Sequence, residues 1–211
     1  MTYQELKAIV EKKGYFFFDE GKYNLNLIGE RTSLIYDDHF HDIFHCAYKD
    51  NNGTEQVLNL PFSTLPGSYW LAHPPTVEGV TGCAVIQPEQ YRGVYKFVDD
   101  YNGWLNYPYL YQVGFMDYWR DNGKSNNVDE MVPANNRIYL TNMHRGSNPG
   151  VTGYTNYNWS EGCQIMEEPY WKQVLPLLRL SIPIWGNLFT YTLMESKDFY
   201  VKDYVCSSNM T

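Results

Sequence analysis

The chain of 211 residues is acidic, with 24 Asp and Glu against 16 Lys and Arg and a formal net charge of −8. This balance disfavours nucleic acids and anionic membrane surfaces as partners, because binding to phosphate groups needs clustered basic side chains. Hydrophobic residues make up 44% of the chain, which suits one globular domain over 1–211 that folds without a disulfide or metal. Its 20 Tyr against 10 Phe favour strands and grooves for polar ligands.

The first segment predicts a short helix. Thr2 and Glu5 have the spacing of a capping box, the apolar residues that follow share one helical face, and Gly14 ends the run. Polar and charged residues near the start do not match a signal peptide, and no run approaches about 18 apolar residues. We therefore expect neither a leader nor a membrane-inserted segment.

From Tyr15 to Phe115 the hydrophobic period changes to two, and clusters of turn residues separate the runs. This pattern predicts short antiparallel strands rather than alternating strands and helices. The segments expected as strands are 32–36, 43–48, 56–60, 68–71, 83–86, 94–98 and 138–143. The expected fold class is mostly β, a β-rich α+β arrangement with a mixed sandwich or barrel.

Two later segments differ from this pattern. Residues 117–136 are rich in Asn, Asp and Gly without periodicity, which predicts a long surface loop. After Cys163 an amphipathic pattern predicts a helix with Pro169 in its first turn, which Pro176 kinks or ends.

One local unit combines an imidazole with a thiol. His144 follows an apolar run, a loop rich in Gly, Asn and Tyr comes next, and Cys163 lies nineteen positions after His144. A cysteine nucleophile needs a nearby imidazole and backbone N–H groups that receive the oxyanion formed on the attacked carbonyl. Gly162 lets the backbone approach a substrate, so the unit is a candidate for nucleophilic catalysis. A buried structural Cys and a satisfied His are the alternative.

The spacing of His144, the Gly-rich loop and Ser160-x-Gly162-Cys163 resembles the signature of the L,D-transpeptidase (YkuD-like) catalytic domain. The residues around the pair are most similar to a phage-associated branch of that family, as are four further stretches: 26–29, 64–70, 90–93 and 119–122. The resemblance covers 24–180, so 1–23 is expected as an N-terminal helix and lead-in and 181–211 as a C-terminal extension.

The resemblance implies a YkuD-like β-sandwich or barrel with a helix after the catalytic Cys, and no cofactor or metal. Cys163 would be the nucleophile and His144 the general base; the N–H groups of Gly162 and Cys163 would form the oxyanion hole, and Ser160 would shape the pocket. Basic side chains that the family often has near the Cys are missing, which makes Arg145 a candidate for holding a substrate carboxylate. The expected substrate-binding residues are Arg145, Gly146, Trp159, Glu161 and Gln164.

The implied function is that of a peptidase or transpeptidase acting on peptidoglycan peptide stems through a thioester, with hydrolysis and cross-linking both open. The implied setting is phage-encoded, in a host cytoplasm or virion, with action at the cell wall after lysis or delivery. The alternative is a catalytically silent virion or wall-binding protein on the same fold.

Weaker signals have simpler explanations beside the functional one. His39, His41 and His45 with Cys46 could hold zinc for a hydrolase, but alternation places the imidazoles on one polar strand face. Residues 121–130 have the acidity of a calcium loop without its spacing.

Four aromatic residues after position 100 could line a groove for glycan or peptide, although core and rim packing explains them as well. They are Trp104, Tyr107, Tyr109 and Tyr111. Of the remaining cysteines, Cys46 and Cys83 lie in strand-like runs and are expected to be inert core thiols, and Cys206 has no assigned role.

Overall fold

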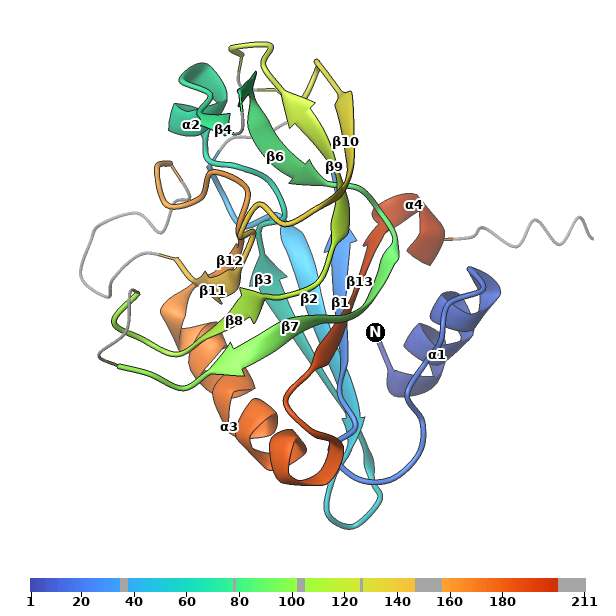
Figure 1. Cartoon of the computed structure of the whole chain (residues 1–211). Coiled ribbons are helices and arrows are strands. Elements are labelled where there is room, and N and C mark those ends of the chain that lie inside the picture. Colours follow the sequence, from blue (N-terminus) through green and yellow to red (C-terminus); the bar gives the residue numbers. More distant parts are fainter. Residues whose placement is uncertain (35–37, 78, 102–104, 126, 147–156, 201–211) are drawn as a thin grey trace, which may run out of the picture.

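The computed structural model describes residues 1–34, 38–77, 79–101, 105–125, 127–146 and 157–200. Strands make up 38% and helices 20% of the described residues, which confirms a mostly β fold with a few helices. The main element is an eight-stranded sheet that curves into a nearly closed barrel (Figure 1). Across the sheet its strands are β12 (Gln164–Met166), β11 (Met143–Arg145), β8 (Tyr109–Gln112), β7 (Gln90–Val98), β13 (Phe189–Glu195), β1 (Asn26–Arg31), β2 (Asp42–Lys49) and β3 (Glu55–Phe62).

A short bridge joins the two edges of this sheet. Ser63, directly after β3, and Ile165 of β12 exchange backbone hydrogen bonds of 2.8 and 3.0 Å. Because Ile165 lies two residues after Cys163, this closure holds the chain around the candidate nucleophile to the far edge of the sheet.

A second sheet lies above the barrel in Figure 1 and consists of β10 (Val132–Arg137), β9 (Met116–Asp121) and β6 (Cys83–Ile86). The hairpin of β4 (Thr76–Val77) and β5 (Val80–Thr81) precedes it in the chain. The expected strand at 83–86 is confirmed as β6, and the expected strands at 43–48, 56–60 and 94–98 lie within β2, β3 and β7.

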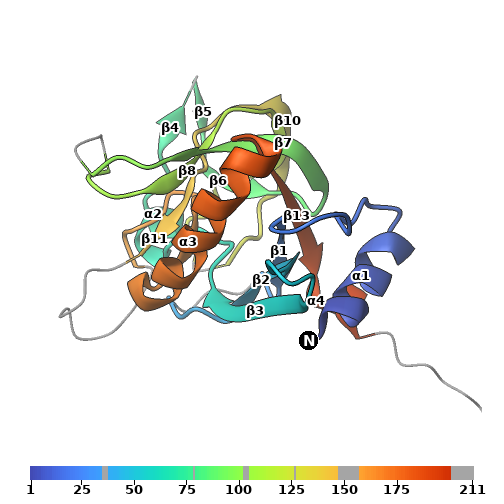
Figure 2. The same ribbon diagram turned by 90° about the horizontal axis from the view of Figure 1, so that it is seen from below.

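The long helix α3 (Glu168–Trp185) lies across the strands in the view from below (Figure 2). Trp171, Val174 and Leu178 of α3 are buried in the same core as the sheet residues Tyr95 and Tyr191. The prediction of a helix after Cys163 is confirmed. Of the two expected effects of Pro176, a kink or an end of the helix, the end is wrong, because α3 continues nine residues beyond Pro176 and its buried apolar side offsets the lost backbone hydrogen bond.

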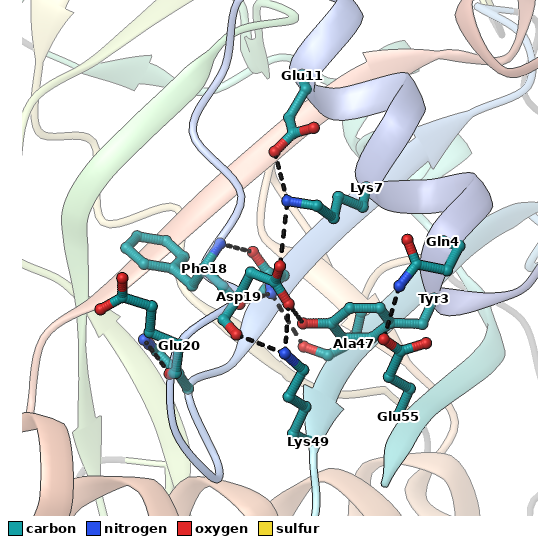
Figure 3. Close-up of polar contacts among 12 residues, drawn as sticks. Tyr3, Gln4, Lys7, Glu11, Phe18, Asp19, Glu20, Ala47, Lys49 and Glu55 are labelled. Carbon is teal, nitrogen blue, oxygen red and sulfur yellow. Dashed lines mark hydrogen bonds and ion pairs between the residues drawn. The ribbon is translucent and has the colours of Figure 1, made fainter. Parts of the chain in front are cut away.

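The N-terminal helix α1 (Tyr3–Lys12) begins at the expected capping box, in which Thr2 and Glu5 bond reciprocally. Polar contacts of Asp19 connect α1 to strand β2 of the main sheet (Figure 3). The carboxylate of Asp19 accepts from the Tyr3 hydroxyl at 2.8 Å and forms ion pairs with Lys7 at 3.2 Å and Lys49 at 2.7 Å. These donors lower the pKa of Asp19 to about 2.

Other predicted elements were wrong. Residues 68–71 belong to the helix α2 (Ser68–Ala72), which follows Gly67 and buries Leu71. The expected loop at 117–136 contains β9 and β10; β10 is almost wholly exposed, so its sequence carries no apolar alternation.

Two expected strands are displaced along the chain. Residues 32–34 follow β1 and are not in a strand, while 35 and 36 lie outside the described residues. Residues 138–142 form an irregular segment before β11.

The expected C-terminal extension contains two ordered elements, β13 and the short helix α4 (Ser196–Phe199). The strand β13 pairs with β1 and β7 and therefore lies inside the main sheet. No helix in the described ranges is both long enough and apolar enough to cross a membrane.

Candidate active site

A cavity of about 530 Å³ contains both His144 and Cys163. It lies between the edge of the barrel at β11 and β12 and the second sheet, from which Ala84 of β6 and Arg120 of β9 line it. The two residues that the sequence singled out for chemistry therefore line one cavity.

Strand pairing explains how these residues meet. β11 and β12 are parallel neighbours in which His144 is opposite Ile165, and Cys163 directly precedes β12. Neighbouring strands lie about 4.8 Å apart, and side chains alternate between the two faces of a sheet. By this alternation His144, Ile165 and Cys163 belong to the same face.

The imidazole of His144 is held in one orientation. Its Nδ1 lies 2.6 Å from the carbonyl oxygen of Arg145 and 3.1 Å from the hydroxyl of Tyr107. Because a carbonyl only accepts, Nδ1 carries the proton and Nε2 is left as the basic nitrogen. Burial lowers the pKa of His144 to about 4, an effect that the Arg145 carbonyl opposes. The imidazole is therefore neutral at pH 7 and able to accept a proton.

The thiol of Cys163 is neutral as well. It donates to the carbonyl oxygen of Leu140 at 3.6 Å. Burial raises the pKa of the thiol to about 12; the backbone of Asn142 opposes this shift and the charge of Glu161 adds to it. A neutral thiol and a neutral imidazole in the wall of one cavity favour proton transfer during attack rather than a resting ion pair.

Leu140, whose carbonyl accepts the hydrogen bond of the Cys163 thiol, is followed by Thr141, and buried polar contacts of Thr141 fix this segment. The backbone oxygen of Thr141 accepts from the Tyr95 hydroxyl at 2.8 Å, and its side-chain hydroxyl lies 2.7 Å from that of Tyr118. The backbone N–H of Thr141 donates to Gln112 at 2.9 Å. Leu140 has a φ of +58°, which L-residues rarely adopt. The strained turn therefore places the Leu140 carbonyl at the thiol, and buried partners hold it there.

The turn before Cys163 is shaped by Ser160. Its hydroxyl donates to the Cys163 carbonyl at 2.7 Å and accepts from the Gly162 N–H at 3.0 Å. Gly162 has a φ of +148°, and a Cβ there would overlap the carbonyl oxygen of Ala84, so only glycine fits. Ser160 thus orders the turn before Cys163, although it was expected to shape the pocket and does not line the cavity. The Gly162 N–H was expected to form part of the oxyanion hole. To do so it must break its hydrogen bond to the Ser160 hydroxyl.

Two of the expected substrate-binding residues, Trp159 and Glu161, line the cavity. Arg145 is not among the lining residues. Its guanidinium lies 4.2 Å from the ring of Tyr107 and forms an ion pair with Glu168 at 3.7 Å. Arg145 therefore acts behind His144, where its carbonyl and side chain support the imidazole and the ring beside it.

Gly146 and Gln164 also do not line the cavity, contrary to expectation. The N–H of Gly146 donates to the Met166 carbonyl at 2.6 Å, and a Cβ there would press on the Phe40 ring. The buried Gln164 accepts from the Tyr191 hydroxyl at 2.8 Å. Both residues hold β11 and β12 in the barrel.

Arg120 also lines the cavity, although it was not among the site residues predicted from the sequence. Met116, Tyr118 and Arg120 are buried at alternate positions of β9. That period of two was the available signal, but the polar residues that follow concealed it.

Of the four aromatic residues proposed for a groove, Tyr107 lines the cavity and Tyr109 and Tyr111 do not. Trp104 and Cys206 lie outside the described residues.

The remaining sequence candidates have structural contacts. His45 is buried between Asn59, at 2.6 Å, and Glu30, at 3.1 Å. Burial raises the pKa of both the Cys46 and the Cys83 thiols to about 12. Among the described residues no group of three His, Cys, Asp or Glu side chains is placed to hold a metal ion.

These contacts define a cavity that holds a thiol, a neutral imidazole and a guanidinium. No protein-family model matches the chain, and neither a curated protein nor a solved structure matches it.

Proposed function

We propose that the protein is a cysteine-dependent acyl-transfer enzyme that acts on the peptide stems of peptidoglycan. The observation that carries this proposal is the position of His144 on β11 and of Cys163 directly before the adjacent parallel strand β12, where both line one cavity of about 530 Å³. A thiol is rarely useful to an enzyme without a base, and a neutral imidazole with an unprotonated Nε2 is such a base.

The proposed reaction begins when Nε2 of His144 takes the proton of the Cys163 thiol as the sulfur attacks a peptide carbonyl. The C–S bond forms, the carbonyl oxygen becomes an oxyanion, and the C–N bond then breaks as the leaving amine takes the proton back from His144. The product is a thioester on Cys163. Water resolves it to a carboxylic acid, and the amine of another stem resolves it to a new peptide bond.

The choice of peptidoglycan stems rests on the resemblance of the His144 and Cys163 unit to L,D-transpeptidases. The cavity is compatible with a peptide, since Trp70, Tyr107 and Trp159 offer aromatic faces and Arg120 and Glu161 offer charges of both signs. Phage encoding and delivery to the wall remain predictions from the sequence.

Purified muropeptides test the proposal. We expect the wild-type protein to remove a terminal residue, cleave dimers or form new dimers, three outcomes that differ in mass. Cys163→Ala is expected to do none of these, while Cys46→Ala serves as a matched change of a buried thiol outside the cavity. Absence of all three products with the wild-type protein would contradict the proposal.

A second candidate is a binding protein that does not turn its ligand over. It is favoured by the thiol's hydrogen bond to the Leu140 carbonyl and by the use of the Gly162 N–H within the turn. This candidate predicts that muropeptides bind equally well to the wild-type protein and to Cys163→Ala, without any product from either.

A further inference from the structure

Arg120 is a buried cation in the wall of the Cys163 cavity. Its side chain is 2% exposed, and it lines the same cavity as the thiol. Burial lowers the pKa of the guanidinium, yet arginine keeps its charge in proteins under ordinary conditions. The cavity wall therefore carries a positive charge that water solvates poorly.

The contacts of Arg120 leave this charge without an ionic partner among the described residues. Nη2 donates to the Val80 carbonyl at 3.3 Å, and the guanidinium lies 4.8 Å from the ring centre of Tyr139. Nε has no hydrogen-bond partner. The charge of Glu161 acts on Arg120 from the same cavity, but no ion pair joins these two described residues.

Strand register places Arg120 close to the nucleophile. Arg120 of β9 is opposite Ala84 of β6, and antiparallel partners share one face of a sheet at about 5 Å. Gly162, directly before Cys163, packs on the carbonyl of Ala84. One residue, Ala84, therefore separates the buried cation from the turn that carries the thiol.

We propose that Arg120 binds a carboxylate of the acyl donor beside the bond that Cys163 attacks. This inference rests on the proposed function and adds a substrate class to it: peptides with a free carboxylate near the scissile bond. A planar guanidinium suits a carboxylate because it can donate two parallel hydrogen bonds, and an anion would supply the partner that the buried charge lacks. Arg120 takes the role that the sequence had suggested for Arg145.

The carboxylate could be the peptide's C-terminus or a side-chain group of the stem. Three peptides separate these sources: the unmodified stem, its C-terminal carboxamide, and the stem with its side-chain carboxyl amidated. Calorimetry with Cys163→Ala measures binding without turnover. We expect one of the two amides to bind about 10- to 100-fold more weakly than the unmodified peptide.

Adding Arg120→Met to the Cys163→Ala background is expected to abolish this preference, while Arg120→Lys should reduce it and Arg92→Met should leave it intact. Arg92 is a matched control because it lines a different cavity, where its guanidinium lies 5.1 Å from the Phe16 ring centre. Thermal unfolding of Arg120→Met checks its folding, and we expect a midpoint no lower than that of the parent because an unpaired buried charge is removed.

Equal affinity for all three peptides, no binding of any, or a preference retained in Arg120→Met would overturn the inference. Because the assay uses a protein without the thiol, its result does not depend on catalysis. Wild-type protein that forms no product would refute the proposed function, whereas a lost or absent carboxylate preference refutes only the role of Arg120.

Discussion

Two cavities of this protein differ in how their charges are balanced. The cavity beside α1 is the larger, at about 650 Å³ against about 530 Å³ for the Cys163 cavity. In the larger one Asp19 lies between Lys7 and Lys49 (Figure 3). In the smaller one Arg120 is buried and Glu161 lines the same cavity, but no ion pair joins Arg120 to any described residue. Ion pairs within a cluster stabilise a fold, whereas a buried charge without an ion pair in the cavity of a thiol is expected to bind a ligand. Ion pairing of the buried charges therefore distinguishes the cavities better than size.

The sharpest test of this difference is loss of the thiol. Cys163→Ala is expected to reduce the turnover of peptide stems by at least about 1,000-fold, because no other group in the cavity can form the thioester. Ser181→Ala, a similarly small change in the wall of the larger cavity, should leave turnover unchanged. Product formation by mass spectrometry measures both. Equal losses in the two variants would remove the functional distinction between the cavities.

Loss of the base is expected to have the next largest effect. His144→Gln should lower kcat by about 100-fold or more while the substrate still binds. In the wild-type protein the pH profile of kcat/KM should stay level well below pH 6.5 and fall only towards pH 4, where His144 becomes protonated. An acid limb between pH 6 and 7 would show that the imidazole is not in the buried, neutral state.

The same imidazole predicts a pH effect on stability. The pKa of His144 is lowered in the folded state to about 4, so the unfolded chain binds its proton first as the pH falls below 6.5. The folded protein should therefore lose about 2–3 kcal/mol of unfolding free energy from this group between pH 7 and 4.5. Urea unfolding at both pH values measures the loss. His144→Gln should lose correspondingly less, and identical losses would contradict the assignment.

The smallest effect is expected from a change of Asp19, which forms ion pairs with Lys7 and Lys49 beside the larger cavity. The pKa of Asp19 is lowered to about 2, so its contribution to stability is present above about pH 4 and is lost as the pH falls towards 2. Asp19→Asn should cost about 1 kcal/mol at pH 7, because the site is partly exposed to solvent. Turnover should be unchanged. Urea unfolding and the muropeptide assay test the two parts separately, and a loss of turnover would tie the larger cavity to function.

Local signals predicted much of the fold. The capping box of Thr2 and Glu5 marks α1, and alternating apolar residues mark β2, β3, β6 and β7. The exposed β10 lacks such alternation, since a strand that buries no face is specified by its partner β9 rather than by its own sequence.

The candidate site was predicted in part, for a similar reason. His144 and Cys163 are recognisable because their chemistry and spacing are local. Arg120 reaches the cavity only through the pairing of β9 with β6, and the Leu140 carbonyl reaches the thiol through a turn with positive φ. Such contacts depend on tertiary structure, which periodicity and propensity do not encode.

The most direct test of the account is the intact mass of the protein during incubation with a peptide stem. A thioester predicts an adduct equal in mass to the acyl part of the stem, located on Cys163, removed by hydroxylamine and absent from Cys163→Ala. His144→Gln should accumulate it far more slowly. An adduct that persists in Cys163→Ala, or stem turnover in that variant at the wild-type rate, would contradict the central claim that Cys163 attacks the peptide carbonyl.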